Sequence, residues 1–191
     1  MSYVKQFLLF ASLVFLTACS EITDDLKPSS SDQREDVVDG SIGNMPGQIL
    51  SDFTIIDTEN NDFTLSEHLN GGTTPADVIV LYFTMWCPVC LSHTDHIHNF
   101  IIPQFSGRGT VVYALVDYVS GSVSITRASA EANGYSNSVF TILADEDQQL
   151  FDQLNAAMGS VVVIDNDGTI LLNEDYRTGT ALAEILELQL P

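Results

Sequence analysis

The sequence predicts an α/β domain built on a mainly parallel central sheet, and three observations support this. Residues 78–83 form an unbroken β-branched and aromatic run, which is typical of a strand buried on both faces of a sheet. Residues 110–116 form a second run of the same kind. Segments with helical patterns alternate with these runs, so the order of elements indicates strand–helix–strand units.

The elements of the first half follow from local signals. We expect a strand at 52–56, a turn at Asn60-Asn61 and a short return strand at 63–65, which together make an N-terminal hairpin. A helix is predicted over 88–100, ending before Pro103.

The second half repeats the alternation and ends on a hairpin. The pattern predicts a helix at 123–132 closed by Asn133-Gly134. It then predicts a strand at 139–143 and a helix at 148–156. Two strands, 161–164 and 169–172, flank the turn sequence Asp-Asn-Asp-Gly, and an amphipathic helix at 181–190 closes the chain.

Composition indicates one globular domain and excludes nucleic-acid binding. The chain has 191 residues, of which 45% are hydrophobic, and a formal net charge of -20 from 26 acidic and 6 basic side chains. Proteins that bind nucleic acids need basic side chains to displace counterions, and this acidic surface would repel phosphate. The apolar fraction is too high for a disordered acidic chain.

The N-terminus has the pattern of a secretory signal. Lys5 precedes an apolar run at 7–17 that is too short to span a membrane, and the run ends in Leu16-Thr17-Ala18-Cys19. This tetrapeptide resembles the bacterial lipobox, which implies cleavage after residue 18 and acylation of Cys19. An ordinary secretory peptide is the alternative. In enterobacterial lipoproteins, Ser rather than Asp after the cysteine implies sorting to the outer membrane, and Ser20 fits this rule.

Three regions follow from this pattern. Residues 1–18 are the predicted signal peptide, residues 19–45 are an acidic, flexible tether, and residues 46–191 are the folded domain. A lipid anchor would place the protein in the cell envelope, and we expect it on the periplasmic face of the outer membrane or exposed at the cell surface.

The chemistry concentrates at Trp86-Cys87-Pro88-Val89-Cys90, where the strand at 78–83 gives way to a helix. Free backbone N–H groups at a helix start favour a thiolate, so Cys87 is the predicted nucleophile and Cys90, one turn further in, the resolving thiol. Pro88 suits the first helical turn. A purely structural disulfide is the alternative, although so short a loop would constrain the unfolded chain little.

Residues 46–175 resemble the redoxin branch of the thioredoxin superfamily, which includes peroxiredoxin-like proteins and tethered oxidoreductases of the TlpA and ResA type. The resemblance rests on Asp52-Phe53-Thr54 with Leu65-Ser66, on the CPVC segment after its apolar strand, and on residues 163–170. It implies a thioredoxin-like fold, with a central mixed β-sheet flanked by helices and an extra N-terminal β-hairpin.

The resemblance also implies an activity. Cys87 and Cys90 would form a redox-active disulfide that exchanges electrons with protein thiols or disulfides and with a redox partner protein, without another cofactor. We expect Trp86, Pro88, Met158 and Gly159 to face the substrate.

The chain departs from the family at three positions. Gly159 stands where relatives have a cis-proline, so we expect a trans loop of different shape there. Leu81 replaces a buried acid that ordinary thioredoxins have, and His93 replaces a glutamate of the tethered enzymes. Because positions 90 and 93 share a helix face, His93 is the candidate proton acceptor for Cys90. An exposed histidine without a role is the alternative.

Two other functions remain open. Cys87, Cys90, His93 and His96 form a candidate set of ligands for Cu(I) or Zn, which predicts a metal-binding or metal-delivery module. The spacing Thr84-Met85-Trp86-Cys87 matches the Thr-x-x-Cys of peroxiredoxins, which predicts a thiol peroxidase, but Thr84 is also an ordinary strand residue.

Overall fold

The computed structural model describes residues 37–191. The predicted signal peptide, the acylation site Cys19 and most of the predicted tether therefore lie outside the described residues. Within the described chain no helix is long and apolar enough to cross a membrane.

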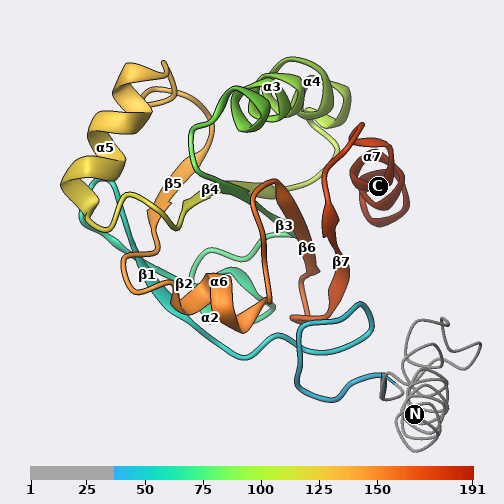
Figure 1. Cartoon of the computed structure of the whole chain (residues 1–191). Coiled ribbons are helices and arrows are strands. Elements are labelled where there is room, and N and C mark those ends of the chain that lie inside the picture. Colours follow the sequence, from blue (N-terminus) through green and yellow to red (C-terminus); the bar gives the residue numbers. More distant parts are fainter. Residues whose placement is uncertain (1–36) are drawn as a thin grey trace, which may run out of the picture. The chain divides into compact units, whose positions relative to one another are not determined.

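A seven-stranded mixed sheet forms the centre of the domain, in the order β2-β1-β5-β4-β3-β6-β7 (Figure 1). The strands are β1 Thr54–Asp57, β2 Asp62–Thr64, β3 Val78–Thr84, β4 Val111–Asp117, β5 Thr141–Ala144, β6 Ser160–Asp165 and β7 Ile170–Asp175. β3, β4 and β5 run parallel, and the other pairings are antiparallel. The predicted mixed sheet and its extra N-terminal hairpin, β1 with β2, are confirmed.

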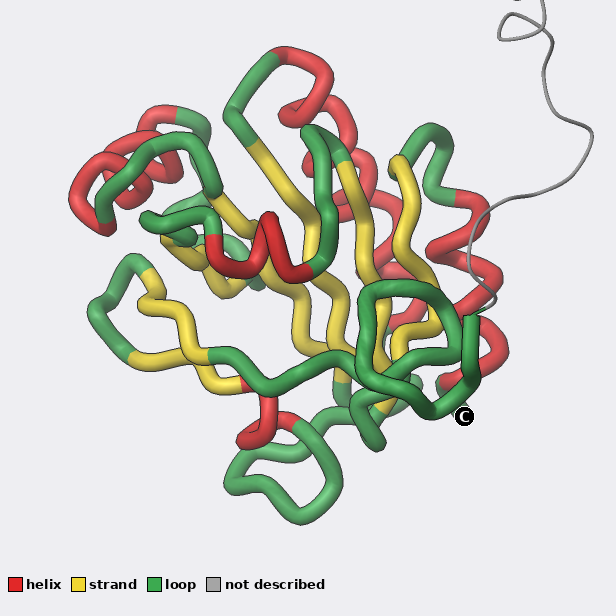
Figure 2. Tube along the Cα trace, turned by 60° about the horizontal axis from the view of Figure 1, so that its bottom comes forward, coloured by secondary structure: helices red, strands yellow, loops and turns green. Residues whose placement is uncertain are grey.

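Helices cover both faces of this sheet, and Figure 2 shows them on either side of the twisted row of strands. They are α2 Leu65–His68, α3 Pro88–His96, the π-helix η1 Ile97–Ile101, α4 Ile102–Phe105, α5 Val123–Ala132, α6 Gln149–Gln153 and α7 Thr180–Gln189. The sheet separates two hydrophobic clusters. One contains residues of α3, η1, α4, α5 and α7, and the other contains residues of α2 and α6.

The central strand β3 contributes to both clusters by strict alternation. Val78, Val80 and Tyr82 join the cluster beneath α3, whereas the side chains at 79, 81 and 83 join the cluster beneath α6. Every residue of β3 is buried. An unbroken apolar run is what a strand covered on both faces requires, and this confirms the prediction for residues 78–83.

The helix that follows the cysteines continues past Pro103, contrary to the predicted end before that residue. Pro103 lies in the first turn of α4, and the chain is helical to Phe105. A proline ring clashes with the carbonyl four residues back in a regular α-helix. Here the π-turn η1 precedes it, with the N–H of Ile102 donating to the carbonyl of Ile97, and the wider turn accommodates the proline within a continuous helical segment.

The predicted helix at 148–156 is shorter in the structure, where α6 ends at Gln153. Asn155 adopts a left-handed φ of 47°, and the N–H of Ala156 donates to the carbonyl of Phe151. This geometry resembles a Schellman ending, which satisfies carbonyls at the end of a helix.

Residues before the predicted domain start also pack on the sheet. The compact unit begins at Val37, and the side chain of Asn173 in β7 donates to the carbonyl of Asn44. The N–H of Gly47 donates to the carbonyl of Ile170, and the Ile170 N–H donates back to Gln48. This loop therefore covers part of the edge of β7, which would otherwise present unpaired backbone groups.

The hairpin of β6 and β7 is confirmed. One oxygen of Asp165 accepts the N–H groups of Asp167 and Thr169, and Gly168 supplies a left-handed φ of 87°. The acids of this segment thus stabilise the turn.

Candidate active site

The cysteine pair lies where β3 ends and α3 begins (Figure 1). Cys87 is the N-cap residue of α3, and its sulfur accepts the N–H of Cys90 at 3.3 Å. Pro88 occupies the first helical turn, where an N–H would have no partner within the helix. The predicted position of both thiols at a strand-to-helix junction is therefore observed.

The two sulfurs are close and differ in exposure. Their Sγ atoms lie 3.0 Å apart, whereas a disulfide bond measures about 2.05 Å, so the structure shows the dithiol form. The Cys90 side chain is fully buried, and Cys87 is partly exposed. Only Cys87 is therefore open to attack a sulfur on another molecule.

The surroundings shift the pKa values of the two thiols in opposite directions. Burial acts to raise the pKa of Cys87, but hydrogen bonds from the Cys90 thiol and from backbone N–H groups at the helix start outweigh it and hold that pKa below the usual value. Burial raises the pKa of Cys90, and the neighbouring Cys87 sulfur raises it further. The pair therefore consists of an accessible thiolate and a shielded thiol.

The loop before β6 faces this pair and has no cis peptide bond, as is true throughout residues 37–191. Met158 contacts the nucleophile, with its Sδ atom 3.5 Å from Sγ of Cys87. Gly159 has a left-handed φ of 83°; its N–H donates to the carbonyl of Phe83 and its own carbonyl accepts the N–H of Tyr176. The loop is trans, as expected for a residue other than proline.

His93 contacts a tyrosine that the sequence analysis did not single out. Its Nδ1 atom lies 3.0 Å from the hydroxyl of Tyr82, and both side chains line the same cavity of about 240 Å³ as Cys90. Burial lowers the pKa of His93, and the nearby His96 lowers it further. The alternation of side chains along β3 could have identified Tyr82 from the sequence, because residues 78, 80 and 82 face α3.

The four predicted metal ligands do not converge. Nδ1 of His96 lies 2.7 Å from the hydroxyl of Tyr176, whereas Nδ1 of His93 faces Tyr82. Within residues 37–191 no three side chains of His, Cys, Asp or Glu are grouped closely enough to hold a metal ion. A site made of both cysteines and both histidines would therefore require rearrangement.

Trp86 is held over the site by a carboxylate from the next strand. Its Nε1–H donates to Oδ2 of the buried Asp117 at 2.7 Å, while Oδ1 of Asp117 accepts the N–H groups of Val119 and Ser120. Trp86 has a left-handed φ of 58°, which is unfavourable for a large side chain and needs such support. Sequence reasoning missed Asp117, although it directly follows the predicted strand at 110–116.

Thr84 supports the same turn. It is fully buried, and its hydroxyl oxygen accepts the N–H of Trp86 at 3.1 Å. This contact gives Thr84 a structural role in the turn before Cys87.

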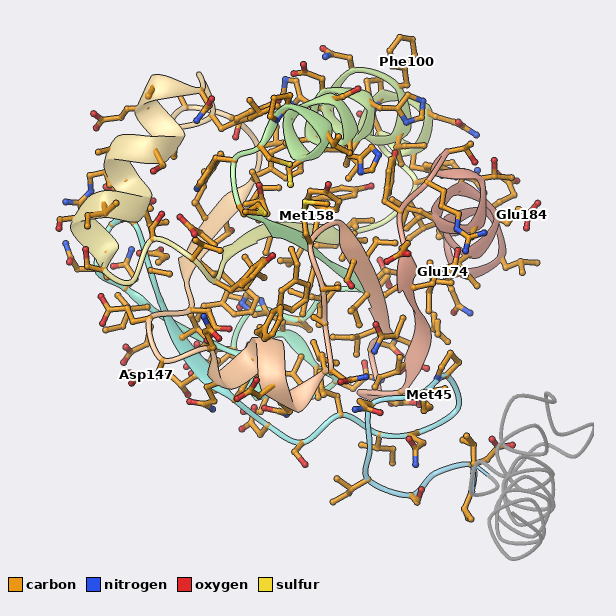
Figure 3. All side chains as sticks on the ribbon, in the orientation of Figure 1. Met45, Phe100, Asp147, Met158, Glu174 and Glu184 are labelled. Carbon is orange, nitrogen blue, oxygen red and sulfur yellow. The ribbon has the colours of Figure 1, made fainter. Side chains whose placement is uncertain are left out.

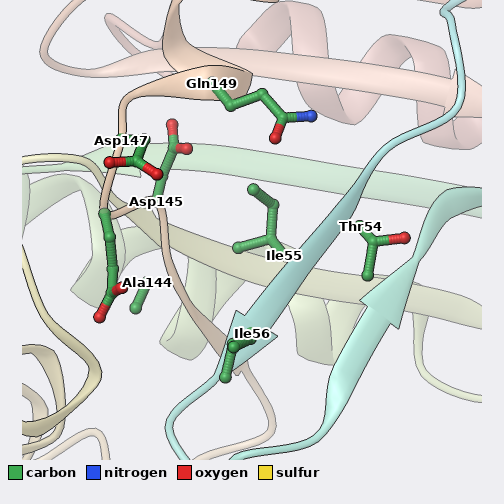
Figure 4. Close-up of a pocket in the computed structure, with 8 residues that line it drawn as sticks. Thr54, Ile55, Ile56, Ala144, Asp145, Asp147 and Gln149 are labelled. Atoms are coloured by element: carbon green, nitrogen blue, oxygen red, sulfur yellow. The ribbon is translucent and has the colours of Figure 1, made fainter.

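A second, smaller hollow of about 130 Å³ lies between β1 and the segment after β5 (Figure 4). Asp145 lines it, and its carboxylate oxygens accept the N–H groups of Leu150 and Phe151. Burial raises the pKa of this carboxyl group, and those hydrogen bonds act in the opposite direction. Asp145 therefore stabilises the start of α6 through these hydrogen bonds.

The comparisons with known proteins agree with this geometry. The Redoxin family model matches residues 45–176, which is more than half of the chain. The chain belongs to the Redoxin family. A comparison with curated proteins gives no match.

Solved structures share the fold of this redoxin at low sequence identity. A proposed protein disulfide isomerase from Bacteroides thetaiotaomicron is 22% identical, with a TM-score of 0.61 over 75% of this chain and 87% of the other. The thioredoxin domain of a thiol-disulfide oxidoreductase from Bacteroides vulgatus is 16% identical, with a TM-score of 0.57 over 77% of this chain and 99% of the other. A thioredoxin-like protein from Aeropyrum pernix is 13% identical, with a TM-score of 0.55 over 72% of this chain and 89% of the other. The predicted thioredoxin-like fold is confirmed.

Proposed function

We propose that this redoxin is an extracytoplasmic thiol–disulfide oxidoreductase that acts on protein substrates through Cys87 and Cys90. The observation that carries the proposal is the asymmetry of the pair. An accessible sulfur with a lowered pKa lies 3.0 Å from a buried thiol with a raised pKa. A structural disulfide needs no such difference between its sulfurs, whereas stepwise exchange does. Two of the structural neighbours are described by names of this enzyme class.

The geometry supports exchange in two steps. The Cys87 thiolate attacks one sulfur of a substrate disulfide, which forms a mixed disulfide and releases the other substrate sulfur as a thiolate. Cys90 then gives up its proton and attacks Sγ of Cys87, which releases the second substrate sulfur and leaves the Cys87–Cys90 disulfide. The substrate gains two electrons and the pair loses two, and the reverse sequence oxidises a substrate dithiol.

The reduction potential of the pair tests this proposal. The full-length chain would be equilibrated in glutathione buffers of graded composition, alkylated and read by mass. We expect a potential above about -300 mV, which marks a pair that exchanges readily. A lower potential would identify a structural disulfide, and failure to form the disulfide at all would also contradict the proposal.

Trapping identifies the partners. Because Cys90 resolves the mixed disulfide, the Cys90→Ser variant should accumulate covalent adducts between Cys87 and substrate proteins. The matched variant Cys87→Ser lacks the exposed nucleophile and should trap none. Equal trapping by both variants would contradict the assigned roles.

The location of the enzyme forms the second part of the proposal. The segment Leu16-Thr17-Ala18-Cys19 supports acylation of Cys19, and the acidic tether supports reach from the membrane. We expect the mature N-terminal peptide to begin at Cys19 and to carry acyl chains in mass spectrometry. The Cys19→Ser variant should move from the envelope membrane fraction to the soluble fraction. An unmodified Cys19 would contradict the anchor.

A further inference from the structure

Two sulfur atoms lie close to the partly exposed Sγ of Cys87. Sγ of Cys87 lies 3.0 Å from Sγ of Cys90 and 3.5 Å from Sδ of Met158. The three side chains come from the N-cap of α3, from its first turn and from the loop before β6, so the fold brings together residues 71 positions apart in the chain. Figure 3 shows Met158 at the end of the sheet that lies below α3.

We propose that the reduced cysteines and Met158 form a three-sulfur binding site for one Cu(I) ion. Thiolates and thioethers are soft ligands, and such ligands select Cu(I) among the biological metal ions. This set differs from the predicted one, because it uses the methionine that touches Cys87 and needs neither histidine. It also goes beyond disulfide exchange, which requires no metal.

The coordination number favours Cu(I) over Zn. A structural zinc site is almost always tetrahedral, with four ligands from cysteine, histidine or carboxylate. Within residues 37–191 no group of three such side chains is available, so a zinc ion here would have only two of its usual protein ligands. Two thiolates and a thioether leave a net charge of -1 around Cu(I), a small residual charge for a partly exposed site.

Small movements suffice to open the site. Three sulfurs in a plane around a metal at about 2.3 Å would lie about 4 Å from one another. The two separations that involve Sγ of Cys87, 3.0 Å to Cys90 and 3.5 Å to Met158, are within about 1 Å of this value. Met158 is 43% exposed and has three rotatable side-chain bonds, so its sulfur can move outward without disturbing the core. Cys87 is also partly exposed, which gives the ion access from solvent.

Gly159 lines the same cavity of about 240 Å³ as Cys90 and Met158. A Cβ atom at this position would lie 3.7 Å from Nδ1 of His93 and 3.8 Å from the hydroxyl of Tyr82, which are ordinary van der Waals distances. The larger ring of a proline would take up part of this cavity.

Binding of Cu(I) to the three sulfurs requires no electron transfer. Cys87 and Cys90 lose any protons that they carry to solvent, three Cu–S bonds form, and copper stays in the +1 state. The disulfide form has no thiolates and should not bind. Copper loading and disulfide formation therefore exclude each other at the same two sulfurs.

Competition for Cu(I) tests the site. The full-length chain, reduced and free of oxygen, would be titrated with Cu(I) against a chromophoric Cu(I) chelator. We expect one Cu(I) per chain, and the Met158→Leu variant should bind at least about tenfold more weakly because it loses one of three ligands. Met45→Leu is the matched control, since Met45 is equally exposed at 43% and lies away from Met158, at the lower right of Figure 3. Its affinity should equal that of the unaltered chain.

X-ray absorption supplies an independent measurement on the unaltered chain. We expect three sulfur neighbours of copper at about 2.3 Å, and two in Met158→Leu. Two sulfurs in both chains, equal affinities, or no binding would overturn the site. Disulfide exchange, measured separately in metal-free buffer, distinguishes the proposals. Exchange without a three-sulfur copper site overturns only the metal inference, and a three-sulfur site without exchange overturns only the proposed activity.

Discussion

The hydroxyl of Tyr82 lies 3.0 Å from Nδ1 of His93, and both side chains border Cys90 in one cavity. The sequence analysis predicts proton transfer from Cys90 to His93, and from this contact we expect the transfer to pass through the hydroxyl of Tyr82. Burial raises the pKa of Tyr82 far above its usual value, and the two thiols raise it further, so the tyrosine stays neutral. A neutral hydroxyl can accept a proton from the thiol while it passes its own to the histidine.

We expect Tyr82→Phe to slow the second step of exchange, in which Cys90 attacks the mixed disulfide. Because the phenylalanine keeps the ring but removes the hydroxyl, the rate should fall by roughly a hundredfold. The rate should fall by a similar factor in His93→Gln, and it should fall no further in the double variant. The measurement is release of a trapped mixed disulfide as a function of pH, and the acidic limb that reports His93 should disappear in both variants.

Tyr113→Phe is the matched control for this prediction. Tyr113 lies on the adjacent strand β4 beneath the same helices and is 8% exposed. Loss of its hydroxyl should leave the release rate and its pH profile unchanged. An unchanged profile in Tyr82→Phe would rule out the proton path through Tyr82.

The second prediction concerns the pH dependence of thiol reactivity. A thiol with a lowered pKa is deprotonated below the usual pH, and one with a raised pKa only above it. In the reduced chain, iodoacetamide should therefore modify Cys87 at a lower pH than an ordinary thiol, and Cys90 only at a higher pH than an ordinary thiol. Mass spectrometry of alkylated peptides over a pH series measures both curves.

The Cys90→Ala variant tests the cause of this shift. It removes the thiol that donates to Cys87, so the alkylation curve of Cys87 should move to higher pH. The backbone N–H groups at the start of α3 remain, and the movement should be partial. A single curve for both thiols in the unaltered chain would refute the assignment.

The sequence predicts the fold well where one local pattern has one structural meaning. The apolar run at 78–83 can only be covered on both faces, and the Asp-Asn-Asp-Gly turn fixes the hairpin of β6 and β7. Pro103 shows where local reasoning ends. A proline normally ends a helix, and only the structure reveals the π-turn that accommodates it.

The candidate site divides in the same way. The thiols, Trp86 and His93 lie within eight residues of one another, and sequence spacing finds them. The family resemblance placed Met158 at the site, but sequence spacing could not find its sulfur contact or the role of Asp117, because these residues approach the site from 71 and 31 residues away. A tertiary contact between distant residues leaves no periodicity in a single sequence.

The third prediction tests the support of Trp86. Asp117 accepts three N–H groups while 1% exposed, and Asp117→Asn turns an amide donor toward at least one of them. The free energy of unfolding should fall by about 2 kcal/mol. Trp86 is the single tryptophan of the chain, so its emission reports the site directly and should shift to longer wavelength as the indole loses its partner.

Asp145→Asn is the control for this fluorescence change. Asp145 is also 1% exposed and accepts backbone N–H groups, but none from tryptophan. It should lose similar stability in urea denaturation without a change in the emission of the folded protein. An unchanged emission in Asp117→Asn would show that the indole does not depend on this hydrogen bond.

The last prediction concerns Gly159, where relatives carry a cis-proline. Gly159→Ala places an ordinary side chain at a φ of 83°, which should cost about 1 kcal/mol of unfolding free energy, and its Cβ would meet nothing closer than 3.7 Å. Gly159→Pro should cost about 3 kcal/mol or more, because proline cannot adopt this φ and the N–H donated to Phe83 is lost. Urea denaturation measures the unfolding free energy of both variants. Gly134→Ala is the control, because Gly134 has a φ of 81° and no atom within 4 Å of its Cβ position, and it should lose as much stability as Gly159→Ala. A stabilised Gly159→Pro would mean that the loop readily adopts the cis form of its relatives, and the trans loop would then be an incidental feature of this chain.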